Sequence, residues 1–170
     1  MIHACWHPGQ MAAIAPLLKP GHRIDRDLVV AASRRGSMEH RAVETLIKGI
    51  EIDLPPGHEF GDKGGHPRRR VPPRVRTRWW DAAADTYRKV ALLDELAREA
   101  LPDTPIPSSA LLGYDADKPV FFGHYWWSGI PGPLATNVAC VDYSAGTGGM
   151  LVAYRWEGES ELDAHGFVSV

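Results

Sequence analysis

The chain of 170 residues is long enough to fold as one domain with a substantial hydrophobic core. Its 19 lysine and arginine residues nearly balance its 21 acidic residues, so overall charge does not favour a polyanion or a membrane surface as partner. No apolar stretch could cross a bilayer, and the first residues lack the basic and apolar regions of a signal peptide. We therefore expect a cytoplasmic protein with no membrane partner, in which Cys5 and Cys140 are buried free thiols.

The first fifty residues predict one short strand followed by three helices. Residues 2–6 are apolar and favour a strand. Short helices are expected at 10–18 and 25–35, because proline and glycine separate these segments. The clearest helix covers 38–50, where apolar residues recur at helical spacing and Ser37 is the expected N-cap.

The middle of the chain, roughly 9–117, is expected to be a helix-rich insertion or flank with a hairpin near 55–80. Aspartate and glycine residues at 60–66 are typical of the tip of a hairpin. A long helix is predicted from Asp81, its N-cap, to Leu101, because apolar residues repeat between them at helical spacing.

Arginines crowd the segment that ends at Trp79 and Trp80. Arginine pairs with phosphate oxygens and nucleotide bases stack on indole rings, so this segment could bind single-stranded nucleic acid or a phosphate. The alternative is a strand with its arginines on a solvated face, which the nearly neutral chain favours. The arginines are Arg68, Arg69, Arg70, Arg74, Arg76 and Arg78.

A short buried strand followed by a histidine is the feature around which the rest is organised. Residues 120–122 are apolar and predict a strand buried on both faces, and Gly123 frees the backbone to turn where the strand ends. His124 follows this turn. Such a histidine is held rigidly and stays reachable, as site residues in α/β folds are. Equally, it could only cap the strand with a hydrogen bond.

The C-terminal part of the chain predicts antiparallel strands. Residues 137–142 are apolar and rich in strand-forming types, and a glycine-rich turn at 146–149 leads into a second apolar run at 150–156. Because the turn is short, we expect these two strands to pair antiparallel. The tail, 167–170, predicts a third strand.

Two histidines, His3 and His124, lie in segments that could be neighbours in one sheet. Neutral imidazoles at rigid strand ends are good ligands for manganese, iron or zinc, but two of them do not complete a site. Asp142 is the only acid at a comparable strand end. We also considered His3, Cys5 and His7 as a zinc cluster, but their spacing is unlike that of structural zinc sites.

Three stretches of the chain form a set: Ile2-His3-Ala4-Cys5, Val120-Phe121-Phe122-Gly123-His124, and the region from Asn137 to Arg155 with its Gly148-Gly149 turn. Together they resemble the C-terminal half of a calcineurin-like metallophosphoesterase. The greatest similarity is to the bacterial branch related to serine/threonine protein phosphatases and diadenosine tetraphosphatases. That family has a strand ending in His-Ala-Gly, a strand ending in Gly-His, and an antiparallel strand after a Gly-Gly turn.

The resemblance implies that His3 and His124 are the two histidine ligands of the family's second metal ion, and that Asp142 orients these ligands or their loop. It also implies hydrolysis of a phosphoester or phosphoanhydride at a two-metal site of manganese, iron or zinc, with a phosphorylated small molecule or a nucleotide as substrate. Cys5 and Trp126 depart from the residues common elsewhere in the superfamily. On chemical grounds alone, the candidate phosphate contacts are Arg34, Arg35, Arg76 and Arg78.

The motifs that supply the family's first metal ligands, bridging aspartate and catalytic acid are Asp-x-His, Gly-Asp-x-x-Asp-Arg and Gly-Asn-His-Glu. None of them occurs in the 170 residues. The chain therefore has no assignable catalytic residue, and we expect it to be inactive alone. The expected partners are a complementing N-terminal half or a second copy of the chain.

The expected fold is α/β: the C-terminal half of a metallophosphoesterase-like sandwich, within a single partial domain, 1–170. One mixed sheet is expected to hold the His3 strand, the strand at 120, and antiparallel strands near 138, 150 and 167. Two other functions stay open. One is a non-catalytic interaction domain that keeps the scaffold, and the other is a nucleic-acid-binding module at 68–80.

Overall fold

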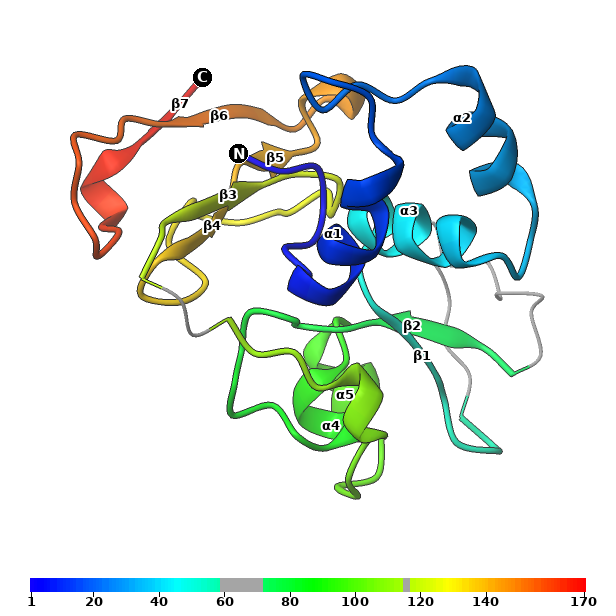
Figure 1. Cartoon of the computed structure of the whole chain (residues 1–170). Coiled ribbons are helices and arrows are strands. Elements are labelled where there is room, and N and C mark those ends of the chain that lie inside the picture. Colours follow the sequence, from blue (N-terminus) through cyan, green and yellow to red (C-terminus); the bar gives the residue numbers. More distant parts are fainter. Residues whose placement is uncertain (59–71, 115–116) are drawn as a thin grey trace. The chain divides into compact units, whose positions relative to one another are not determined.

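A computed structural model describes residues 1–58, 72–114 and 117–170 (Figure 1). Short helices and small sheets alternate along these ranges, so the expected mixed α/β class is confirmed, as are antiparallel strands near the C-terminus. Within these ranges, no helix is long and apolar enough to cross a membrane.

The chain divides into two compact units. Unit 1 consists of Met1–Lys48 and Ala116–Val170, and unit 2 consists of Gly49–Asp115. Each unit has its own buried apolar residues, and we describe each by itself.

The three helices expected early in unit 1 are confirmed. They are α1 (Pro8–Ile14), which a 3-10 turn at Ala15–Leu17 follows, α2 (Arg26–Ser33) and α3 (Met38–Lys48). Both α1 and α2 pack against α3 (Figure 1). Their shared core is formed by Ile14, Leu28 and Ala42, with Leu18, Val43 and Leu46 partly buried around it.

Side chains cap two of these helices, Ser37 as predicted and Asp25 in addition. The hydroxyl of Ser37 accepts a hydrogen bond from the backbone N–H of His40 at 2.9 Å, and the carboxylate of Asp25 accepts one from Leu28 at 2.9 Å. Each bond satisfies a donor that the first turn of a helix leaves without a backbone partner. Local signals therefore determine where α2 and α3 begin.

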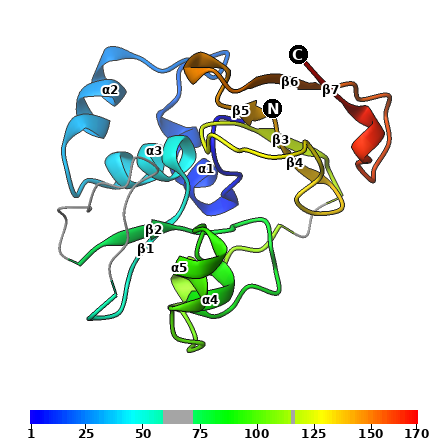
Figure 2. The same cartoon turned by 180° about the vertical axis from the view of Figure 1, so that it is seen from behind.

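Two small sheets complete unit 1. In the first, β3 (Val120–Phe122) lies parallel to β4 (Val138–Cys140). In the second, β6 (Met150–Tyr154) lies between β5 (Asp142–Tyr143) and β7 (Phe167–Ser169), with both pairings antiparallel (Figure 2). Single 3-10 turns at Ala145–Thr147 and Ala164–Gly166 precede β6 and β7.

The prediction of one strand at 137–142 is wrong, and so is that of one mixed sheet. The segment divides into β4 and β5, which have different partners. At the division, the N–H of Val141 donates to the carbonyl of Phe122 at 2.9 Å. All three residues of β4 are buried, as in a strand covered on both faces, whereas burial alternates along β6. Only β5 therefore joins the antiparallel sheet.

The predicted strand at 2–6 is not formed. The N–H of Ile2 donates to the carbonyl of Phe121 at 2.9 Å, but the N–H of Cys5 donates to the carbonyl of Leu46 in α3 at 3.4 Å. The chain thus changes partner after His3, so no ladder extends along the segment. Cys5 and Cys140 are buried free thiols, as expected.

Unit 2 contains a hairpin-like pair of strands and two short helices. The strands β1 (Glu51–Asp53) and β2 (Arg74–Arg76) are antiparallel, with Ile52 opposite Val75. The predicted hairpin tip at 60–66 lies outside the described residues. After β2 come α4 (Tyr87–Val90), α5 (Glu95–Glu99) and a 3-10 turn at Ser108–Ala110.

The long helix predicted from Asp81 to Leu101 is wrong. The backbone of residues 90–92 pairs with residues 76–78 instead: Arg78 N–H donates to the Val90 carbonyl, and Leu92 N–H to the Arg76 carbonyl, both at 2.8 Å. The segment becomes extended at Ala91 (φ −64°, ψ 127°). Pairing between distant segments therefore overrides the helical periodicity.

Candidate metal centre

Two imidazole rings, those of His3 and His124, lie side by side in unit 1. Their centroids are 5.0 Å apart and their planes are tilted by 44°. His3 is exposed and His124 is half-buried, so solvent reaches both rings. The structure therefore brings together the two histidines that the sequence singled out.

Backbone hydrogen bonds place both histidines at the end of β3. The N–H of Gly123 donates to the carbonyl of His3 at 2.9 Å, and the Ile2 bond to Phe121 lies beside it. His124 then has a left-handed backbone, with φ at 71°. This conformation costs a residue with a side chain about 1–2 kcal/mol, and such strained residues occur preferentially at functional sites.

Buried aromatic packing supports this strained turn. Tyr125, which is only 3% exposed, packs edge-on against Phe122 with ring centroids 5.2 Å apart. Its ring is also 6.2 Å from that of His124, nearly at a right angle. The residue after His124 is thus fixed in the core, which limits the directions that the imidazole can take.

Asp142 lies next to the same turn. A Cβ atom added to Gly123 would be 3.3 Å from the Cβ of Asp142 and 3.9 Å from its Oδ2. The Oδ1 atom accepts a hydrogen bond from the N–H of Ser144 at 3.1 Å, and the backbone carbonyl accepts one from Trp127 at 2.8 Å. Asp142 therefore links β5 to the loop after His124, which suits a residue that orients this loop.

The histidine pair fits one shared metal ion but does not complete a site. Imidazole nitrogen binds zinc at about 2.0–2.1 Å, which places ring centroids about 3 Å from the ion and about 5 Å from each other. The separation in unit 1 matches that value. Among the described residues, however, no group of three or more histidine, cysteine or acidic side chains could hold an ion. Within the described part of the chain, the two imidazoles are therefore not joined by a third such side chain.

His7 has a structural role. Its Nδ1 atom accepts a hydrogen bond from the N–H of Gln10 at 3.4 Å and so caps α1. Burial lowers the pKa of His7 below its ordinary value, which keeps the ring neutral and able to accept this bond.

The four candidate arginines fall in different units. Arg34 and Arg35 are exposed residues just after α2 in unit 1, whereas Arg76 and Arg78 belong to unit 2. Arg78 forms an ion pair with Asp81 at 3.2 Å.

The aromatic residues of the basic segment do not offer a stacking surface. Trp79 and Trp80 are 1% and 2% exposed, and their rings pack edge to face with centroids 5.7 Å apart. Arg74 forms an ion pair with Asp53 at 2.6 Å. Arg68, Arg69 and Arg70 lie outside the described residues. Since stacking needs exposed ring faces, the described part of this segment gives the nucleic-acid alternative no support.

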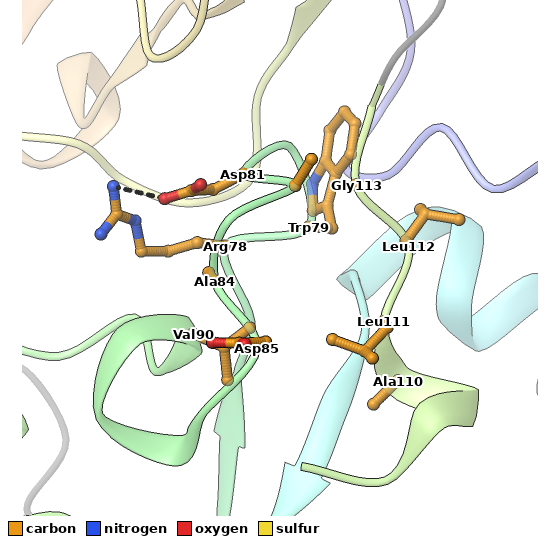
Figure 3. Close-up of a pocket in the computed structure, with 11 residues that line it drawn as sticks. Arg78, Trp79, Asp81, Ala84, Asp85, Val90, Ala110, Leu111, Leu112 and Gly113 are labelled. Atoms are coloured by element: carbon orange, nitrogen blue, oxygen red, sulfur yellow. Dashed lines mark ion pairs between the residues drawn. The ribbon is translucent and has the colours of Figure 1, made fainter. Parts of the chain in front are cut away.

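A pair of cavities in unit 2 was not predicted. Arg78 and Asp81 line both of them, and apolar side chains line most of one (Figure 3). No sequence signal indicated them, because the helical periodicity of 81–101 assigned many of their residues to one continuous helix.

Comparison of the chain with known protein families, with curated proteins and with solved structures finds no match.

Proposed function

We propose that unit 1 contributes His3 and His124 to the metal centre of a metallophosphoesterase-like hydrolase. The observation that carries the proposal is the 5.0 Å separation of the two imidazole rings, which come from opposite ends of the sequence. The finer fold that we propose for unit 1 is the C-terminal half of a metallophosphoesterase sandwich. The substrate would be a phosphorylated small molecule or a nucleotide.

The role of each residue follows from its contacts. His3 and His124 bind one manganese, iron or zinc ion through neutral imidazole nitrogens. Asp142 orients the loop, since its carboxylate and carbonyl accept bonds from Ser144 and Trp127. The complete two-metal site would activate water and neutralise charge at phosphorus. Because the remaining ligands are missing, the chain alone is expected to be inactive.

The first test is binding of Mn²⁺ to the full chain, followed by calorimetry and by paramagnetic broadening of histidine NMR signals. We expect broadening of His3 and His124, and loss of this binding in His3→Ala. The matched control is His165→Ala, whose side chain is 94% exposed in the turn before β7. Equal Mn²⁺ affinity in His3→Ala and the parent chain would reject the metal site.

The second test determines whether the metal site takes part in hydrolysis or only binds an ion. Manganese-dependent hydrolysis of an aryl phosphate and of diadenosine tetraphosphate is measured for the chain alone and for the chain joined to a segment with the missing motifs. Activity only in the joined form, lost again in His124→Ala, would support half of a phosphoesterase. Inactivity in both forms would favour the interaction domain.

One observation favours the interaction-domain alternative. Leu151 and Val170 are 63% and 92% exposed and lie opposite each other on β6 and at the end of β7. Val168, beside them, is 57% exposed. All three side chains are apolar, so a second copy of the chain could cover them without burying an unpaired charge. Sedimentation equilibrium of Val168→Lys against the parent chain tests for the homo-oligomer, which the lysine should dissociate.

A further inference from the structure

Two adjoining cavities lie within unit 2. The first, which we call the apolar cavity, has a volume of about 180 Å³, and the second, the basic cavity, one of about 470 Å³. Arg78, Asp81 and Ala84 line both, so the two spaces share a wall. Sites for small organic ligands are typically about 300–1,000 Å³, a range that the basic cavity reaches alone and the apolar cavity extends.

The walls of the apolar cavity are preformed. Trp79 is 1% exposed and packs edge to face against Tyr114, with ring centroids 6.2 Å apart. Val90 and Ala110, both buried, and the half-exposed Leu111 complete the apolar lining (Figure 3). A rigid apolar wall of this kind binds a ring without reorganising the protein.

Close approach of two backbone segments holds this cavity in shape. Gly113 has a φ of 57°, and a Cβ atom added to it would lie 2.9 Å from the Cα of Ala82. Only glycine fits there without a shift of the backbone. The segment 110–113 is therefore fixed against the loop that carries Arg78 and Asp81.

Cationic side chains dominate the basic cavity. Its lining includes Arg78, Arg88, Lys89 and Arg98, against the acidic Asp81 and Glu99. Asp81 pairs with Arg78 at 3.2 Å, and Asp85 pairs with Lys89 at 2.9 Å. The Nε of Arg88 donates to the carbonyl of Leu101 at 2.9 Å.

Two of these guanidinium groups have no carboxylate partner among the residues that the structure describes. No ion pair joins Arg88 or the half-buried Arg98 to an acidic side chain in the parts of the chain that the structure describes. Both line the same cavity, and guanidinium groups pair most strongly with planar or tetrahedral anions. An anionic group in the basic cavity would supply the missing partner.

We propose that unit 2 binds a small organic anion that carries an apolar ring. The ring occupies the apolar cavity beside Trp79, and the carboxylate or phosphate group lies in the basic cavity at Arg88 and Arg98. Arg78, which Asp81 holds at the shared wall, contacts the junction of ring and anion. The site lies wholly within unit 2 and is independent of the metal centre proposed for unit 1.

The test is an NMR titration of the full chain with four probes in buffer that contains a chelator of divalent metals. The probes are phenyl phosphate, phenylacetate, inorganic phosphate and benzyl alcohol, and the readout is the indole N–H signal of Trp79. We expect the two aromatic anions to shift this signal at concentrations about tenfold lower than the other two probes, because only they fill both cavities. The better of the two identifies the anion as phosphate or carboxylate. Equal affinity for inorganic phosphate and phenyl phosphate would overturn the proposal.

Substitutions then test the two ends of the site separately. Arg98→Gln should weaken phenyl phosphate about tenfold, because a hydrogen bond to a charged group is lost. Leu111→Ala should weaken phenyl phosphate about fivefold and leave inorganic phosphate unchanged. The control is Arg74→Gln in β2, an arginine of the same unit outside both cavities, which should bind as the parent chain does. Unchanged binding in Arg98→Gln, or equal weakening in Arg74→Gln, would overturn the assignment.

Discussion

In unit 1 the histidine pair is placed by backbone hydrogen bonds at the end of a buried strand, whereas in unit 2 the cavities are formed by side chains from short helices and loops. The rings of His3 and His124 depend on the Gly123 bond and on a left-handed residue. The cavities depend instead on Trp79 and on arginines of α4 and α5. A backbone-built site holds its donors at fixed distances, which suits a metal ion. A cavity lined by packed side chains instead presents an apolar wall, which suits the ring of an organic ligand.

This difference predicts different responses to substitution. Strand residues beneath the histidine pair should control metal affinity, and the aromatic cluster of unit 2 should control the cavities. Each unit should also lose its own function first when its core is damaged.

Removing a large core side chain from either unit should cause the largest loss of stability. Phe122 is fully buried in unit 1 and Trp79 nearly so in unit 2. Phe122→Ala and Trp79→Ala should each lower the free energy of unfolding by about 3–5 kcal/mol, because a cavity replaces a packed aromatic ring. Hydrogen exchange measured residue by residue should show the main loss of protection in the altered unit. Equal loss throughout both units would mean that they unfold as one.

Alanine substitutions at two glycines should cost less stability, and by different amounts. At one glycine there is no room for a Cβ atom, whereas the other needs only its left-handed backbone. Gly113 and Gly36 both have positive φ, at 57° and 88°, but only Gly113 has neighbours where a Cβ would lie. Gly36→Ala should cost about 1–2 kcal/mol from backbone strain, and Gly113→Ala about 2–4 kcal/mol because the methyl also meets Ala82. Urea unfolding measures both. Similar costs would show that segment 110–113 moves away easily and that the apolar cavity is not rigid.

The predicted helices α1, α2 and α3 formed because their signals are local. Ser37 and Asp25 cap the first turns from positions next to the helices, and the apolar repeat needs only a core to pack against. The predicted helix from Asp81 to Leu101 failed for the opposite reason. Its apolar repeat was real, but the extended pairing of residues 90–92 with 76–78 joins distant segments, which periodicity does not report.

The contrast between local signals and long-range contacts also applies to the two candidate sites. His3 was found because it lies in an apolar segment, His124 because it follows one, and Asp142 because it ends another. Their proximity depends on long-range backbone bonds, which the local sequence around each histidine does not specify. The cavities were not found, since Arg88 and Arg98 lie on two separate helices rather than one. Residue type alone does not say which arginines line a common space.

Acid should lower the stability of unit 1 by a smaller amount than these substitutions, through the protonation of His7. Burial lowers the pKa of His7 from its ordinary value of 6.5, so the unfolded chain binds a proton at a pH where the folded chain does not. Stability contributed by His7 is therefore full above about pH 6.5 and is lost as the pH falls below this value. Protonation also removes the acceptor that caps α1, and a lost cap costs about 0.5–2 kcal/mol.

His7→Asn isolates this contribution, because asparagine is a good N-cap that does not titrate. The free energy of unfolding, measured in urea from pH 7.5 to 5, should fall less steeply with acid in His7→Asn than in the parent chain. His165→Ala, which removes an exposed histidine, should follow the parent curve more closely. If His7→Asn and the parent chain lose stability in parallel, the acid sensitivity of unit 1 arises from other groups and the cap of α1 does not depend on a neutral imidazole.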